Sequence, residues 1–206
     1  MAQREDTIMN RITLILATVL SLAFTQVTAQ DYNKGLEAYN AMDYATALKE
    51  WKPLAEQGNA DAQYNLGLMY NEGKGVLQDY AEAVKWYRLS AEQGVAYAQF
   101  NLGRIYWNGI GVLQDYAEAV KWYRLSAKQG YVGAHFSLGV MYEFGHGVLQ
   151  DNVTAHMWYN IASANGGENA GGYRDKRADL MTAEDISKAT AMAKECMASD
   201  YKKCGY

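Results

Sequence analysis

A stretch of 12 residues, YAEAVKWYRLSA, occurs twice in this chain, at Tyr80–Ala91 and at Tyr116–Ala127. A shift of 36 residues also superimposes three copies of GVLQD, and 25 of the 36 residues in 80–115 recur in 116–151. A period of this length is typical of solenoids, in which each repeat is one supersecondary unit that buries its apolar face only against its neighbours. The chain is therefore predicted to be a repeat array, an architecture that usually displays a surface and seldom carries a catalytic pocket.

Each repeat carries the signals of two helices. Asp79 immediately precedes the repeated stretch, and Glu82 comes three residues after Asp79, as in a capping box. Gly94 stands where the helix should end. The same three residue types recur 36 residues later. The segment 96–106 has apolar residues at i, i+4 and i+8, which indicates another helix. The predicted fold is all-α, a solenoid of helix-turn-helix repeats.

A glycine recurs inside the first helix of each repeat, at Gly67, Gly103 and Gly139. Glycine in a helix interior costs about 0.5–1 kcal/mol relative to alanine. Its recurrence predicts that a neighbouring helix approaches too closely at this position for a side chain to fit.

These units resemble a known family of repeats. Their form, AxAxxxLGxxYxxGxGVxxDxxxAxxWYxxAAxxG, is similar to Sel1-like repeats, which are relatives of the tetratricopeptide repeat, and here to those of exported bacterial proteins. The match is strong over 59–165, and the LGxxYxxG core is present in 60–73, 96–109 and 132–145. The resemblance implies a right-handed α-superhelix of about five helix pairs that serves as a protein-binding scaffold.

The chain outside the array divides into three further regions. We expect a signal peptide at 1–29, a degenerate opening repeat at 30–58, the repeat array at 59–166, and capping helices with the cysteine pair at 167–206. The uncharged run Ile12–Phe24 follows Arg11 and precedes small residues, as in a secretory signal whose start is Met1 or Met9. A membrane anchor is the alternative, although a helix over this run would reach only about 20 Å of the roughly 30 Å apolar core. The signal predicts a periplasmic or secreted protein.

The only cysteines of the chain are Cys196 and Cys204. An even pair in an exported protein favours a disulfide, because the compartment is oxidising. Free thiols and a metal site are the alternatives. Zinc needs about four ligands, and no histidine or second cysteine pair lies nearby.

The remaining signals for chemistry are weak, and we expect no catalytic residue, cofactor or metal. The net charge of -4 argues against nucleic acid as a partner. Ser199 and Lys202 match the SxxK motif of β-lactamases and penicillin-binding proteins, but the partnering motifs are absent. Some cysteine-rich relatives of these repeats are linked to β-lactam binding, so an enzyme or binding protein for β-lactams or cell-wall fragments is the alternative function. A structural subunit of an envelope machine is a third reading.

We expect another protein to bind where the first helices of the units differ between repeats, because recurring residues hold the repeats together. Tyr97, Arg104, Trp107 and Asn108 differ from their counterparts and are spaced to share one helical face. Tyrosine, tryptophan and arginine dominate binding hot spots. The candidate partner-binding residues are Tyr97, Arg104, Trp107, Asn108, His135, Glu143 and Phe144, with neutral surface drift as the alternative explanation.

Overall fold

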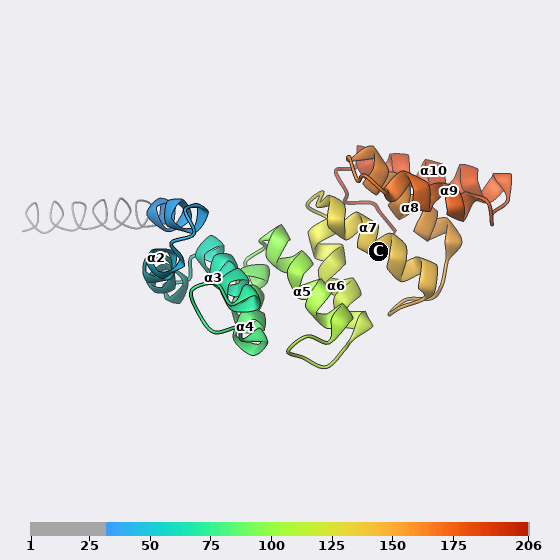
Figure 1. The fold of residues 1–206 in the computed structure, drawn as a ribbon. Coiled ribbons are helices and arrows are strands. Elements are labelled where there is room, and N and C mark those ends of the chain that lie inside the picture. Colours follow the sequence, from blue (N-terminus) through green and yellow to red (C-terminus); the bar gives the residue numbers. More distant parts are fainter. Residues whose placement is uncertain (1–31, 206) are drawn as a thin grey trace, which may run out of the picture.

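The computed structural model describes residues 32–205, and this range contains helices, turns and loops but no strand. The helices are residues 32–40, α2 (Tyr44–Glu56), α3 (Ala60–Glu72), α4 (Tyr80–Glu92), α5 (Ala96–Asn108), α6 (Tyr116–Ala127), α7 (Val132–Phe144), α8 (Asn152–Ala164), α9 (Ala170–Ala178) and α10 (Ala183–Ala198). They pack against their neighbours in chain order along an elongated array (Figure 1). The predicted all-α solenoid of about five helix pairs is confirmed. The signal peptide expected at 1–29 lies outside the described residues.

Within the array, α3, α5 and α7 each open a unit, and we call them the opening helices. The helices α4, α6 and α8 close the same units and pack against them. Among residues 32–205, every helix is too short or too polar to span a lipid bilayer.

Aspartates begin the closing helices, as the sequence predicts, but the capping box is only half formed. The side chain of Asp79 accepts hydrogen bonds from the backbone N–H groups of Ala81 and Glu82. The backbone N–H of Asp79 itself donates to the carbonyl of Tyr70 at 3.0 Å, so it is already satisfied. Glu82 therefore has no donor to cap, and its carboxylate pairs with Lys85 at 3.1 Å instead.

Glycine ends the opening helices. Gly109 closes α5 with φ of 68°, and its N–H donates to the carbonyl of Ile105. This left-handed conformation carries little penalty for glycine and a considerable one for a residue with a Cβ. The chain can therefore leave α5 at a sharp angle and return along α6.

The recurring glycine inside each opening helix lies under an aromatic ring. A Cβ added to Gly103 would lie 2.6 Å from the ring of Tyr123 on α6, closer than two carbons can approach. Gly67 and Gly139 stand in the same relation to Tyr87 and Tyr159, again at 2.6 Å. The predicted close approach is confirmed. The neighbour is a tyrosine ring of the closing helix in the same unit.

The core runs between units and gives the array its continuity. Leu66, Leu102 and Leu138 recur at one register, and all three are buried. Each belongs to a different apolar cluster, and the last of these clusters also includes residues of α10 and both cysteines. Because every unit buries its apolar face against the next, the last unit must be covered by something other than a repeat.

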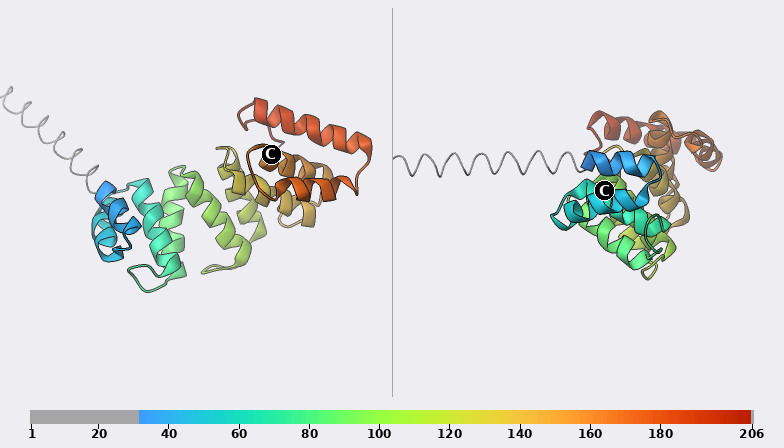
Figure 2. Two further views of the ribbon diagram at one scale, coloured as in Figure 1. Left: turned by 45° about the horizontal axis from the view of Figure 1, so that its top comes forward. Right: turned by 60° about the vertical axis from the view of Figure 1, so that its left-hand side comes forward.

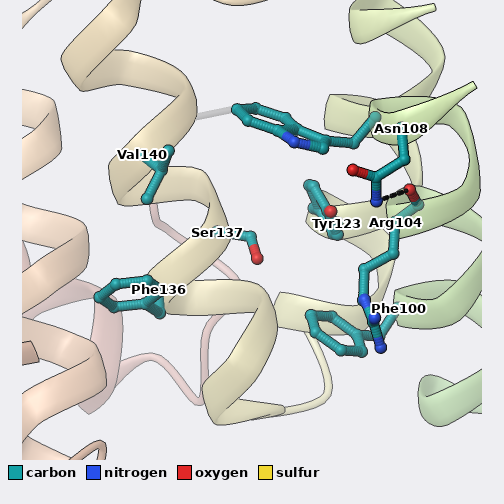
Figure 3. Close-up of a pocket in the computed structure, with 8 residues that line it drawn as sticks. Phe100, Arg104, Asn108, Tyr123, Phe136, Ser137 and Val140 are labelled. Carbon is teal, nitrogen blue, oxygen red and sulfur yellow. Dashed lines mark hydrogen bonds between the residues drawn. The ribbon is translucent and has the colours of Figure 1, made fainter. Parts of the chain in front are cut away.

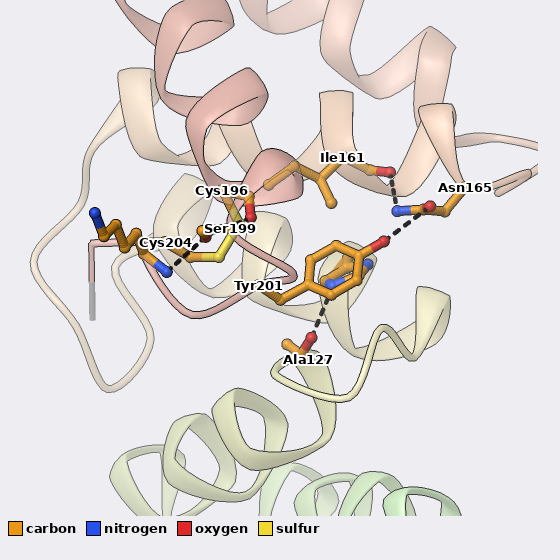
Figure 4. Close-up of a disulfide and its surroundings, with 9 residues drawn as sticks. Ala127, Ile161, Asn165, Cys196, Ser199, Tyr201 and Cys204 are labelled. Atoms are coloured by element: carbon orange, nitrogen blue, oxygen red, sulfur yellow. Dashed lines mark hydrogen bonds between the residues drawn. A yellow bond between two sulfur atoms is a disulfide. The ribbon is translucent and has the colours of Figure 1, made fainter.

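That cover is the C-terminal helix pair. Both α9 and α10 pack against α8, and α10 lies along the outer side of this end of the array (Figure 2). Thr182 caps α10 by accepting a hydrogen bond from the N–H of Asp185. Cys196 at the end of α10 and Cys204 in the tail form a disulfide (Figure 4).

Candidate functional site: a groove along the opening helices

Two adjoining hollows lie between the opening helices, and together we call them the opening-helix groove. The hollow between α5 and α7 has a volume of about 290 Å³ and is shown in Figure 3. It is lined by Phe100, Arg104, Trp107, Asn108, Tyr123, Phe136, Ser137 and Val140. The hollow between α3 and α5 is smaller, about 100 Å³. It is lined by Leu68, Asn71, Glu72, Tyr87, Asn101, Arg104, Ile105, Asn108 and Ile110.

Arg104 and Asn108 line both hollows, so α5 forms the ridge between them. They are four residues apart and therefore lie on one face of the helix. Both are exposed, and the side-chain amide of Asn108 donates to the carbonyl of Arg104 at 2.8 Å. Arg104 and Asn108 therefore share one accessible face of α5, and binding of a partner there stays a prediction.

Aromatic rings form the walls of the α5–α7 hollow. Phe100 packs on Tyr123 with ring centroids 5.8 Å apart, and Phe136 packs on Tyr159 at 5.4 Å. Phe100 and Phe136 recur at one register, and recurrence alone predicts a packing role for them. Both rings are only half-buried, so they serve the core and the groove together. The sequence signal that could identify them as groove residues is an aromatic residue that recurs on the same helices as the candidate partner-binding residues.

Arg104 is the only charged residue that lines the α5–α7 hollow. Its guanidinium carbon lies 6.0 Å from the centroid of the Phe100 ring. Within residues 32–205, no carboxylate lies at ion-pair distance from this guanidinium. Burial raises the pKa of the Tyr123 hydroxyl to about 12, against smaller downward effects of a hydrogen bond with Ser137 and the charge of Arg104. The hollow thus presents neutral hydroxyls and one cation at neutral pH.

Tyr97 and Trp107 mark the two ends of the α5 face. Tyr97 is 56% exposed, and its ring lies edge-on to Tyr131 with centroids 5.4 Å apart. Trp107 is half-buried and packs edge-on against Tyr116 at 5.3 Å and His146 at 5.2 Å. Tyr97 is therefore free to contact a partner, whereas Trp107 offers only part of its ring.

Phe144 is the remaining exposed candidate. It is the last residue of α7, is 59% exposed, and lies 5.9 Å from the ring of His146. It does not line either hollow. Phe144 thus extends the accessible aromatic surface beyond the groove.

The prediction that His135 faces the groove is wrong. His135 is 0% exposed, and its Nε2 atom is hydrogen-bonded to the carbonyl of Ala127 at 3.0 Å. Gln63 and Gln99 occupy the same register and bond Ala55 and Ala91 in the same way. The side chain at this register therefore ties each opening helix to the helix that precedes it, and in the last unit that side chain is a histidine.

The prediction that Glu143 contacts a partner is also wrong. Glu143 is 8% exposed, forms an ion pair with Arg177 of α9, and accepts a hydrogen bond from the hydroxyl of Tyr159 at 2.5 Å. Its counterparts in the earlier units do not face a capping helix, which is why the residue differs there. Glu143 anchors the C-terminal cap.

The SxxK match does not assemble a catalytic pair. The hydroxyl of Ser199 donates to the carbonyl of Cys196 at 2.8 Å and accepts from the backbone N–H of Lys203 at 2.9 Å. The amine of Lys202 lies 3.9 Å from Asp200, with both side chains exposed. Ser199 thus closes the end of α10 through backbone contacts. No group of three or more possible metal ligands occurs within residues 32–205.

Comparisons with known proteins agree with this geometry. The Sel1 repeat profile matches residues 60–95, 96–131 and 132–167, which are the three units opened by α3, α5 and α7. No curated protein sequence matches the chain significantly.

Two solved structures are similar to the chain over most of its length. One is c5321, a protective antigen present in uropathogenic Escherichia coli strains that displays an SLR fold, with 36% identity and a TM-score of 0.71. The match covers 85% of this chain and 40% of that protein, so the chain spans less than half the length of this relative. The other is a Sel1 repeat protein from Oxalobacter formigenes, with 31% identity, a TM-score of 0.66 and coverage of 82% and 74%. Because the matched repeats make up more than half of the sequence, the chain belongs to the Sel1 repeat family.

Proposed function

We propose that this protein is a non-enzymatic interaction scaffold that binds a segment of another protein in the opening-helix groove. The observation that carries the proposal is the concentration of accessible, repeat-specific side chains on α5, around hollows whose walls are aromatic. Arg104 and Asn108 line both hollows, and neither is used to join one unit to the next. A solenoid has no other need for an arginine at this register, since the other units place leucine and valine there.

The composition of the groove supports a protein partner over a small metabolite. The α5–α7 hollow, at about 290 Å³, is at the lower limit of the range for small-molecule pockets, which is roughly 300–1,000 Å³. Partly buried aromatic rings beside an arginine are the composition of interaction hot spots. A groove of this kind fits side chains that project from an extended or helical segment.

We also propose that the scaffold acts in the periplasm or outside the cell. The disulfide between Cys196 and Cys204 supports this location, because structural disulfides persist in oxidising compartments. The sequence of 1–29 supports it independently, since it has the plan of a secretory signal. We propose, in the same way, that 30–58 is a degenerate opening repeat, 59–166 is the array, and 167–206 is its cap.

The β-lactam alternative is not favoured. It depends on Ser199 as a nucleophile and Lys202 as its base, and these side chains make other contacts. Within the described chain, no serine or cysteine that lines the groove is hydrogen-bonded to a basic side chain, as an activated nucleophile would be.

Co-purification from an envelope extract tests the proposal. Tyr97→Ala and Arg104→Ala should each reduce recovery of a specific partner while leaving the melting temperature unchanged, because both side chains are exposed. Lys121→Ala is the matched surface control, because Lys121 is exposed and lines neither hollow. A partner that is recovered equally well by all variants would show that the groove is not the binding surface.

A further inference from the structure

The contacts of Arg104 differ from those of the other arginines of the array and cap. Arg88 and Arg124 donate to the hydroxyls of Tyr106 and Tyr142. Arg174 pairs with Asp175, and Arg177 pairs with Glu143. Arg104 is exposed, and its guanidinium lies over the ring of Phe100. Figure 3 shows its side chain extended along the wall of the hollow beside that ring. The guanidinium is therefore available to an incoming anion.

The neighbouring carboxylate does not neutralise this charge. Glu72 lines the α3–α5 hollow, but it forms an ion pair with Lys74 at 2.7 Å and accepts a hydrogen bond from Tyr39. The α5–α7 hollow is lined by no aspartate or glutamate. Within residues 32–205, neither hollow therefore supplies a carboxylate at ion-pair distance from Arg104.

The rest of the α5–α7 hollow is suited to bind an apolar side chain of a partner. Phe100, Trp107, Phe136 and Val140 line it, and its volume of about 290 Å³ suits one or two bulky side chains. Burying such a side chain favours binding, because its apolar surface is removed from water. Water leaves the hollow as it fills, which strengthens any ion pair at its edge.

We infer that the partner segment carries a bulky apolar side chain that enters the α5–α7 hollow and, within one or two residues of it, a carboxylate that pairs with Arg104. Guanidinium and carboxylate form paired, charge-assisted hydrogen bonds, which fix the direction of the segment. The chain has a net charge of -4, so no long-range field attracts an acidic partner, and recognition depends on this local pair. This inference rests on the proposed function.

Selection of random linear peptides displayed on phage against the purified chain tests the inference. Enriched peptides should combine a leucine, phenylalanine or tryptophan with a nearby aspartate or glutamate. For a synthetic copy of one such peptide, carboxylate-to-amide substitution should weaken binding to the wild-type chain about ten-fold. The same substitution should change binding to Arg104→Ala less than two-fold, because the two changes remove one interaction. Lys121→Ala is the control and should bind as wild type does.

The outcomes separate the inference from the proposed function. Val140→Trp and Asn108→Trp each fill the hollow from a different helix, and at least one should fold with an unchanged melting temperature. If the peptides are blocked by these variants but show no carboxylate preference, or no coupling to Arg104, the inference is wrong and the groove still binds. If no peptide is enriched, or if filling the hollow leaves binding unchanged, both the inference and the proposed function fail.

Discussion

The ring of Tyr201, in the C-terminal tail, packs on the imidazole of His135 with centroids 4.9 Å apart. The Tyr201 hydroxyl donates to the side-chain oxygen of Asn165 at 3.0 Å (Figure 4). In the two preceding units, the registers of His135 and Asn165 are both occupied by glutamine. Gln93 donates to Gln63, and Gln129 donates to Gln99. The tail therefore closes the array with a tyrosine where the other units close themselves with a glutamine pair.

Removing the Tyr201 ring should destabilise the last unit. Tyr201→Ala should lower the free energy of unfolding by about 3 kcal/mol, because a half-buried ring and its hydrogen bond are both lost. Tyr201→Phe keeps the ring and should cost only about 1 kcal/mol. Urea denaturation followed by circular dichroism measures both. Equal losses for the two variants would show that the ring contact contributes nothing.

The disulfide should hold this tail in place. Cys196 and Cys204 are buried, so alkylating reagents should label neither until a reductant is added. Reduction should lower stability by about 2–3 kcal/mol, as expected for a short closed loop. Mass spectrometry after alkylation counts the labelled thiols. Rapid labelling of both cysteines without reductant would contradict the bridge.

Acid should destabilise the protein through His135. Burial lowers the pKa of His135 from 6.5 to about 4, so the folded state holds the imidazole neutral while the unfolded chain binds a proton more readily. Stability from this residue is complete above pH 6.5 and is lost as the pH falls toward 4, by up to about 3 kcal/mol. Burial also lowers the pKa of His156, which acts in the same direction.

The matched variant for this prediction is His135→Gln. Glutamine stands at this register in the other units and makes the same hydrogen bond, but it does not titrate. The variant should lose a smaller part of its stability between pH 7 and pH 4 than the wild type. An unchanged pH dependence would show that His135 is not responsible.

The recurring helix glycines should resist substitution. Gly103→Ala places a Cβ against Tyr123 and should cost about 1–3 kcal/mol, although alanine is the better helix former. Gly172 is the control, because it lies in α9 and an added Cβ would meet nothing within 4 Å beyond its chain neighbours and the nearby backbone of its own helix. Gly172→Ala should raise stability by up to about 1 kcal/mol. Thermal melts that shift in the same direction for both variants would contradict the packing argument.

The repeat predicted the helices, their limits and most of the core, because a residue that recurs at one register meets the same neighbour in every unit. The exception is Leu113 and its counterparts Leu77 and Leu149, which recur in the loops. Leu113 is 91% exposed, so recurrence at this position does not reflect packing.

The candidate site could be predicted only in its middle unit. The opening helix α5 has a repeat on either side, so a residue that differs there, such as Arg104, remains on the surface. In the last unit Glu143 is buried because it pairs with Arg177 of the cap, whereas Phe144 remains exposed. His135 lies at a register that is buried in every unit, as Gln63 and Gln99 are. The path of α9, α10 and the tail depends on long-range contacts that no periodicity encodes.

The most direct test of the groove is photo-crosslinking from single positions. A photoreactive phenylalanine analogue placed at Asn108 lies on the ridge between the two hollows, whereas one placed at Lys121 of α6 lies outside both hollows. Both positions are exposed, so both variants should fold normally. Irradiation in an envelope extract should give a specific adduct from position 108 and none from position 121. An adduct of the same mass from position 121 alone, or none from position 108 with the partner present, would contradict the account.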